Sequence, residues 1–393
     1  MSAILPYDEQ TNGDPEGALL LGEALEPREY ALTAAGPTVG VIPMDPEFSK
    51  ESLDRSHTML TRLVYARAVV AQALAGVNVS VSQGRGKAID RCQVFLTLDR
   101  ELPKNVVPWM SMSKSLKSIA LLSSTGKMVC PSFSLPSGPL DAGGSCPAAA
   151  WTVSGGKVPR GVELEPSENA LAATVCQNCY TQVGHYGVTG NIANAVVRYL
   201  WTKAALAMPA QDSRFSNAFV ETMVAAVANA HYNLCAEPAE NAFFRIHDSG
   251  DFFSVKYLEA WKEIADNFVR RTGKTPRVVF WAPTRMWVFP KWVEAVNRVN
   301  GKPRNLTIRP SVYSIGEPAP RRLGPGWAAG TTVFPKAQVE EAQAAGDFDW
   351  NCAAFASQNK EHNCQNGLSP EGNRGCRACW QNRSLAVNYV FHY

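Results

Sequence analysis

The sequence predicts an α/β fold, a partial (β/α) barrel or an open parallel sheet with flanking helices, followed by a cysteine-rich metal-binding C-terminal segment. Residues 241–316 alternate between short apolar runs and amphipathic helical patterns, which is typical of βαβ units and a parallel sheet. The C-terminal segment contains four cysteines in a stretch with little apolar content, so a metal would be needed to order it.

The chain before this alternation divides into an arm and the start of the core. Residues 1–55 are rich in Pro, Gly, Glu and Asp, so we expect an extended or poorly ordered arm. The α/β core is expected over 56–345, and it begins with a helix whose apolar face is interrupted only by Arg67. Gly, Pro and polar clusters predict an inserted loop at 147–173. Strands are expected at 92–100 and 127–138.

The remaining core elements follow from hydrophobic periodicity. The clearest helix carries Tyr257, Leu258 and Trp261 on one face and ends at Gly273. Helices are expected at 191–208, 216–235, 254–273 and 289–301, and strands at 241–252, 276–285 and 304–316.

Polar residues collect at the ends of the last three predicted strands. Ligand sites of parallel α/β folds lie at the carboxyl ends of the strands, so acid, hydroxyl and guanidinium groups would meet there. Taken singly, Asp251 could instead cap the next helix and Arg285 could pair with a surface carboxylate. The candidate catalytic residues are Asp248, Asp251, Arg285 and Arg309. The candidate cofactor-binding residues are Ser249, Gly250, Asp251, Thr284 and Ser311.

The cysteines of the predicted tail, 346–393, have metal-ligand spacing. Cys376 and Cys379 form a CxxC pair, and Cys352 and Cys364 precede it. Four thiolates suit a tetrahedral zinc or an iron–sulfur cluster equally well. We expect these four cysteines to bind a metal. We also expect the tail to pack on the core.

A second cysteine group lies upstream. Cys146, Cys176 and Cys179 supply three thiolates, which leaves one coordination position open for a substrate or cofactor. His185 could close the site and make it a structural zinc site instead. The other thiols are expected to be packed core residues: Cys92, Cys130 and Cys235.

Charge and hydropathy limit where in the cell the protein is expected and which partners it is expected to bind. The net charge of +3 and the pI of about 8.3 are too slight to indicate nucleic-acid binding across the whole surface. No stretch approaches the roughly twenty apolar residues of a membrane span. We expect a cytoplasmic protein, in a reducing compartment that leaves the cysteines free for metal, with no membrane partner.

Several motifs carry a resemblance to a known family. The stretches "FSLPSG", "SCPAA", "CQNCY", "RIHDSGDFFSVKYLEAW", "VVFWAPTR" and "CRACW" resemble the phage gene product eighty-eight-like family, common in phages of actinobacteria. The resemblance covers roughly residues 125–385, and the SGDFFS segment is its most specific part. It implies a phage origin and a location in the host cytosol, and by itself it implies no reaction.

The pattern is also distantly similar to radical S-adenosylmethionine enzymes. By that similarity Cys146, Cys176 and Cys179 would hold a [4Fe–4S] cluster, and "DSGD", residues 248–251, would contact the methionine moiety of S-adenosylmethionine. Two features differ from that family: the long spacing between Cys146 and Cys176, and the aromatic Tyr180, which follows the last cysteine.

Two functional hypotheses result. The first is a phage-encoded iron–sulfur protein, a radical S-adenosylmethionine-like enzyme acting on an unidentified substrate. The alternative is a zinc-stabilised phage protein without catalysis that binds nucleic acid or a host protein, with which basic segments such as "VRRTGK" and "PAPRRLG" are compatible.

Overall fold

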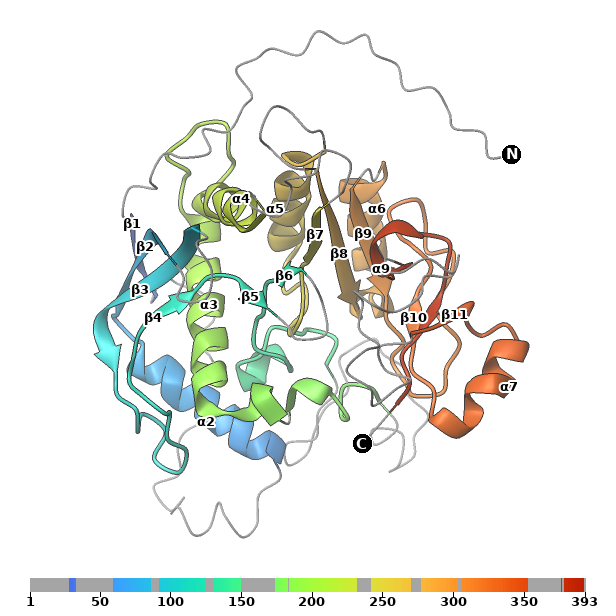
Figure 1. Cartoon of the computed structure of the whole chain (residues 1–393), viewed down its shortest axis with the longest axis horizontal. Helices are drawn as coiled ribbons and strands as arrows, with labels where there is room; N and C mark the ends of the chain where they lie inside the picture. Colours follow the sequence, from blue (N-terminus) through green and yellow to red (C-terminus); the bar gives the residue numbers. More distant parts are fainter. Residues whose placement is uncertain are drawn as a thin grey trace, which may run out of the picture.

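The structure is a computed structural model, shown in Figure 1. It describes residues 28–32, 59–85, 92–124, 130–149, 174–182, 184–231, 242–269, 277–302, 305–352, 376 and 378–391. Most of the predicted arm, most of the predicted loop 147–173, Cys235 and Cys364 lie outside these residues. The described part contains three sheets, and one apolar core joins the two larger ones.

The sheet that positions the candidate site has five strands in the order β5-β6-β7-β8-β9. The edge strand β5 is antiparallel to β6, and the other neighbours are parallel. The strands are β5 (Ser123–Ser124), β6 (Pro131–Ser132), β7 (Ala242–Arg245), β8 (Val278–Thr284) and β9 (Leu306–Pro310).

Two helices connect the parallel strands, as the alternating pattern predicts. Helix α5 (Val255–Asp266) leads from β7 to β8, and α6 (Pro290–Asn300) leads from β8 to β9. The hydroxyl of Ser254 caps α5 by accepting a hydrogen bond from the Tyr257 amide at 3.2 Å. Among the described residues no strand closes this sheet into a barrel, and the predicted α/β class with a parallel sheet and flanking helices is confirmed.

The two faces of the parallel sheet are covered by different parts of the chain. Phe244 and Phe280 pack on Trp261 of α5, at 5.6 and 6.4 Å between ring centroids. On the other face Trp281 lies 5.2 Å from Trp380, a residue of α9 (Ala378–Gln381). Because side chains of a strand alternate between faces, the C-terminal tail covers the face that the helices leave open.

A second, antiparallel sheet packs on the helices α2, α3 and α4. Its order is β1-β2-β3-β4, and its first strand comes from the predicted arm. Helix α3 contacts α2, α4 and β1, and α4 contacts β3. The elements are β1 (Arg28–Ala31), α2 (Met59–Ala73), β2 (Asn78–Arg85), β3 (Cys92–Leu102), β4 (Leu116–Ala120), α3 (Thr189–Ala207) and α4 (Ala218–His231).

Two strands of the tail, β11 and β12, form a small parallel sheet with β10, in the order β10-β12-β11, next to helix α7. No helix of the described residues is long and apolar enough to cross a membrane. The elements are β10 (Thr331–Thr332), α7 (Val339–Ala344), β11 (Trp350–Asn351) and β12 (Val387–Asn388).

Candidate functional site

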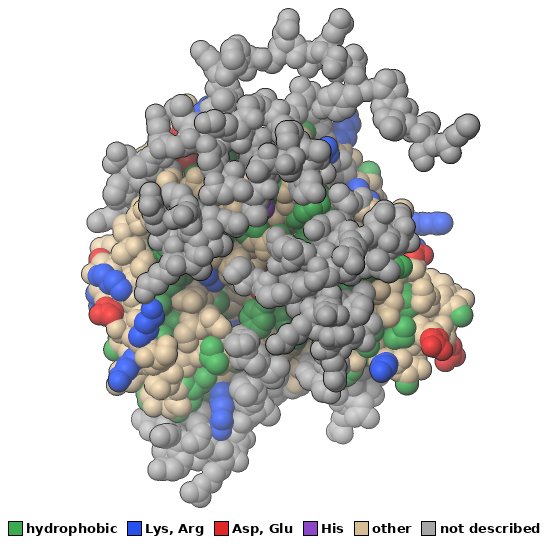
Figure 2. Space-filling view, viewed as in Figure 1, with side chains coloured by type: hydrophobic (Ala, Val, Ile, Leu, Met, Phe, Trp, Pro, Cys, Tyr) green, Lys and Arg blue, Asp and Glu red, His purple; other side chains and the backbone are tan. Residues whose placement is uncertain are grey.

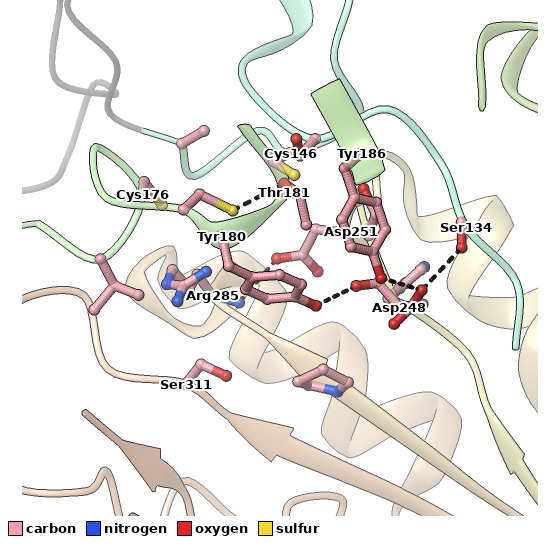
Figure 3. A pocket seen from close by; sticks show the side chains of 18 of the residues that line it. Ser134, Cys146, Cys176, Tyr180, Thr181, Tyr186, Asp248, Asp251, Arg285 and Ser311 are labelled. Carbon is pink, nitrogen blue, oxygen red and sulfur yellow. Dashed lines mark hydrogen bonds between the residues drawn. The ribbon is translucent and has the colours of Figure 1, made fainter. Parts of the chain in front are cut away.

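A cavity of about 810 Å³ lies at the carboxyl ends of β7, β8 and β9. Its walls come from α2, α3, the loop after β6, the segment around the first CxxC pair, and the tail. Figure 3 shows this cavity from close by. The location is the one expected for a ligand site in a parallel α/β fold, and the volume suits a small molecule.

All three cysteines of the upstream group line this cavity. The Cys146 amide donates a hydrogen bond to the carbonyl of Gly138 at 2.8 Å, and the Cys179 amide donates to that of Cys176 at 3.3 Å. The sulfur of Cys179 is 3.0 Å from the hydroxyl oxygen of Thr181. Two separate tight turns thus bring cysteines thirty residues apart to one wall, where Figure 3 labels Cys146 and Cys176.

The environment of these thiols is buried and contains arginines. Burial, and then the neighbouring Asp251, raise the pKa of Cys146 well above its usual value. Burial lowers the pKa of Arg67 to about 10, although the charges of Cys146 and Cys179 act in the opposite direction. Arg285 is half-buried, and the nearby cysteines and Asp251 outweigh the effect of burial and raise its pKa. Cationic side chains are therefore in place to compensate thiolates.

A single ion has no complete binding site within the described part of the chain. No group of three or more His, Cys, Asp and Glu side chains there is arranged to hold a metal ion. Cys364 lies outside the described residues, and the side chain of His185 is not described. The four-cysteine tail site and the possible closure by His185 therefore stay predictions.

Two thiols of the tail line the same cavity as the upstream group, which the sequence did not predict. They are Cys352 and Cys379, and the sulfur of Cys379 is 3.1 Å from the hydroxyl oxygen of Tyr389. Burial raises the pKa of Cys379. Cys130 instead packs in an apolar cluster with Trp281 and Trp380, as expected for a core thiol.

Asp251 connects the ends of β7 and β8. One carboxylate oxygen accepts hydrogen bonds from the hydroxyl of Thr284 at 2.6 Å and from the amide of Phe252 at 2.7 Å. The other oxygen accepts from the amide of Arg285 at 2.9 Å. Burial raises the pKa of Asp251 to about 6, and these hydrogen bonds and Arg285 reduce the shift. Asp251 thereby positions Arg285, whose Nε donates to the carbonyl of Val312 at 3.0 Å.

The Ser249–Gly250 turn packs tightly against the loop after β6. The hydroxyl of Ser249 donates to the carbonyl of Leu135 at 2.7 Å. Gly250 has a φ of +91°, and a Cβ atom there would lie 2.5 Å from the hydroxyl oxygen of Ser145. Only glycine fits this position without strain, because L-residues avoid this backbone region and the space is already filled.

Asp248 is the centre of a second hydrogen-bond network. Its side chain accepts from the hydroxyls of Tyr186 and Ser134, and it pairs with Arg245 at 3.2 Å. The hydroxyl of Tyr180 donates to the Asp248 carbonyl and accepts from Arg245 at 3.2 Å. Figure 3 shows the two tyrosines and Asp248 together in the cavity wall. Asp248 thus holds aromatic side chains at the site.

The two candidate residues at the end of β9 have different surroundings. The hydroxyl of Ser311 lines the cavity and accepts from Thr331 at 3.0 Å. Arg309 does not line the cavity but points to the tail, and its guanidinium donates to five backbone carbonyls, four of which lie in the tail. These carbonyls belong to Cys379, Ala329, Leu385, Ala378 and Asn382. The structure thus separates Arg309 from the other strand-end candidates.

His247 lines the cavity as a neutral side chain. Its Nε2 is 3.3 Å from the hydroxyl oxygen of Tyr257, and its Nδ1 makes no hydrogen bond with any described residue. Burial, and then the charge of Arg245, lower its pKa to about 3. The ring also packs edge-on against Phe252, with 4.6 Å between centroids.

Several lining residues lie outside the candidates selected from the sequence. Arg67 has a detectable signal, because it is the only polar residue on the apolar face of its predicted helix. Arg198 interrupts the apolar surface of α3 in the same way. Tyr180 and Tyr186 have no such signal, since only the fold brings them next to Asp248. Among the lining residues added by the structure are Arg67, Ser134, Tyr180, Tyr186, Asn194, Arg198 and Arg245.

The fold and the cavity define an α/β protein whose open parallel sheet ends in a site of thiols, arginines and buried carboxylates. The chain belongs to the Gene product 88 family, whose model matches residues 109–382. This match confirms the resemblance to the phage gene product eighty-eight-like family. The family match does not support the more distant similarity to radical S-adenosylmethionine enzymes. No curated protein and no solved structure matches the chain.

Proposed function

We propose that this chain is an iron–sulfur protein in which Cys146, Cys176 and Cys179 hold a [4Fe–4S] cluster. The observation that carries the proposal is the presence of all three thiols in one cavity at the carboxyl ends of the sheet. With three protein ligands, one iron keeps an open position for a small molecule. S-adenosylmethionine is the ligand that the sequence similarity suggests, and the reaction would then be a radical S-adenosylmethionine-like one.

The donor set fits such a cluster in two ways. Thiolates suit soft, iron-containing centres, and the cationic Arg67 and Arg285 lie close enough to influence them electrostatically. Thiolates on different irons of a cluster lie farther apart than thiolates on one ion, so the lack of a single-ion site among the described residues is compatible with a cluster. Because burial favours the protonated thiol of Cys146, cluster binding would release protons.

The residues of the chain would bind and orient a ligand at this centre. The bound cluster would supply one-electron chemistry and an open coordination position. Asp251 holds Thr284 and Arg285 in the cavity wall through two hydrogen bonds. Ser249 and Gly250 fix the turn that carries Asp251, and Ser311 adds a hydroxyl group to the same cavity.

We propose a second, structural metal site in the tail, held by Cys352, Cys364, Cys376 and Cys379. Cys352 and Cys379 lie against the core and line the cavity, and Cys379 belongs to the helix that covers the sheet. A metal at this position would attach the segment between residues 352 and 376 to the core.

The test is the metal content of the anaerobically purified protein, together with its visible absorption. We expect iron, sulfide and broad absorbance near roughly 400 nm, and an electron paramagnetic resonance spectrum that changes when S-adenosylmethionine is added. Cys179→Ser should remove the upstream cluster and spare the tail metal. The control Cys130→Ala should keep both, because Cys130 packs in the apolar core.

A colourless protein that contains zinc would contradict the cluster and favour the alternative function. In that case the protein would be a zinc-stabilised module that binds nucleic acid or a host protein. Among the described residues on the face drawn in Figure 2, Lys and Arg side chains are interspersed with Asp and Glu.

A further inference from the structure

Helix α3 presents a polar face to the cavity. Asn194 and Arg198 both line it. They are four residues apart, so they are neighbours on one side of the helix. Neither residue is a ligand of the proposed cluster, and neither has been given a role in the proposed function.

Arg198 is a buried cation without a hydrogen-bonded carboxylate. Its Nε and Nη2 both donate to the carbonyl of Ala120, at 3.3 and 2.9 Å, while among the described residues no hydrogen bond is made by Nη1. Burial lowers the pKa of Arg198 to about 10, and the charge of Asp248 only partly opposes this. Asp248 itself is already engaged by Arg245, Tyr186 and Ser134.

Asn194 supplies an unused acceptor beside this cation. Its carbonyl oxygen is buried and accepts no hydrogen bond from a described residue. A buried acceptor without a donor destabilises the protein, and so does a buried charge without a counter-charge. One ligand could satisfy both groups if it carried an anionic group next to a hydroxyl or ammonium donor.

We propose that the α3 wall of the cavity binds an anionic small molecule. The guanidinium of Arg198 binds the anionic group, and the side-chain carbonyl of Asn194 accepts a hydrogen bond from an adjacent hydroxyl or ammonium. Guanidinium groups bind carboxylate and phosphate alike, so the anion is either a carboxylate or a phosphoryl group. The inference names the substrate class for the cavity of the proposed function.

Binding of small probes to the full-length protein tests this inference. The probes are lactate, propionate and inorganic phosphate, titrated at constant ionic strength and followed by ligand-detected NMR. Propionate lacks the hydroxyl of lactate, so the pair isolates the contact with Asn194. Preferred binding of phosphate would identify a phosphoryl source of the anion, and preferred binding of lactate would identify a hydroxy or amino acid.

Two variants and one control decide the outcome. Arg198→Met should weaken every bound probe by about tenfold or more, the usual effect of losing a charged hydrogen bond. Asn194→Ala should weaken lactate several-fold and leave propionate unchanged. Arg298→Met removes an exposed arginine from α6 and should change nothing. Thermal unfolding should confirm that Arg198→Met is folded, and Asn194→Ala keeps the test decisive if it is not.

Failure of this inference can be distinguished from failure of the cluster. No probe binding to the wild type, or equal binding to Arg198→Met, would overturn the anion site whatever metal is present. Probe binding that persists in Cys179→Ser, after loss of the upstream metal, would support it independently of the cluster.

Discussion

Arg309 shows how the pleat of a strand decides the role of a single side chain. By its position in the sequence it belongs with the polar strand ends. In the structure its Cα is paired across the sheet with that of Pro283, and it shares a face with Trp281, which the tail covers. Its five carbonyl acceptors all lie in the tail or just before it. Arg309 is therefore a buried connection between the sheet and the tail.

Arg309→Ala should destabilise the protein by about 3 kcal/mol or more, because it leaves five buried carbonyls without their charged donor. Chemical denaturation measures this loss. Arg298→Ala is the control, since Arg298 is 67% exposed in its pair with Glu259 and its removal should change the free energy of unfolding by less than about 0.5 kcal/mol. Equal effects of the two substitutions would contradict a structural role for Arg309.

Alanine substitutions at Gly250 and Gly190 test whether the turn at the site requires glycine. Gly250→Ala should destabilise by about 1 to 3 kcal/mol, because its φ of +91° is unfavourable for alanine and its Cβ would lie 2.5 Å from Ser145. Gly190 lies at the start of α3, and a Cβ atom there would have nothing within 4 Å. Gly190→Ala should therefore be neutral or stabilising. Thermal or urea unfolding of both variants measures the difference, and a reversed order would exclude the proposed steric constraint.

Secondary elements were predictable where the pattern is local. The strands and helices between residues 242 and 310 appear in the predicted order, because an amphipathic stripe and a capping serine are properties of neighbouring residues. The predicted end of the first of these helices at Gly273 is wrong, since α5 ends at Asp266. In the described part of the predicted strand at 127–138, only Pro131–Ser132 is a strand, and a single residue of it, Ser132, is paired with β7. Of the antiparallel sheet, the strand predicted at 92–100 appears as β3, but β1 and its pairing were missed, because β1 pairs with β2 across an intervening stretch of about fifty residues.

The residues of the candidate site were likewise predictable only where the sequence pattern is local. Strand ends and paired cysteines are visible in the sequence, and those that the structure describes line one cavity, except Arg309 and Cys376. The α2 and α3 walls were not predictable as a site, because Arg67 and Arg198 acquire their neighbours only through helix packing. The tail thiols Cys352 and Cys379 reach the cavity because α9 covers the sheet, a contact between segments about 100 residues apart.

The short helix α9 should contribute strongly to stability. Trp380 is buried against Trp281 and Phe243, and its indole nitrogen donates to the carbonyl of Phe244 at 3.0 Å. Trp380→Ala should cost about 3 to 5 kcal/mol, as expected for a buried tryptophan. It should also make the segment after residue 350 more sensitive to limited proteolysis. Trp380→Phe is the control and should lose less of both, and unchanged proteolysis in Trp380→Ala would contradict a covering role for α9.

For the whole molecule, two buried groups give pH dependences of opposite sign. The pKa of Asp251 is raised from 3.8 to about 6, so the folded state binds its proton more tightly than the unfolded state does. Stability from this group therefore decreases as the pH rises from about 4 to about 6. The pKa of His247 is lowered from 6.5 to about 3, so the unfolded state binds that proton more tightly. Its contribution is lost as the pH falls below about 6.5.

Between pH 4 and 6 the two slopes oppose each other, and each amounts to at most about 1.4 kcal/mol per pH unit. The wild type should therefore show a weaker dependence than either variant. His247→Gln leaves Asp251 as the contributor of the two, so its stability should fall, relative to the wild type, as the pH rises through this window. Asp251→Asn leaves His247, so its stability should rise over the same window. Urea denaturation at several pH values measures both curves, and parallel curves for the two variants would show that these side chains do not titrate as their burial requires.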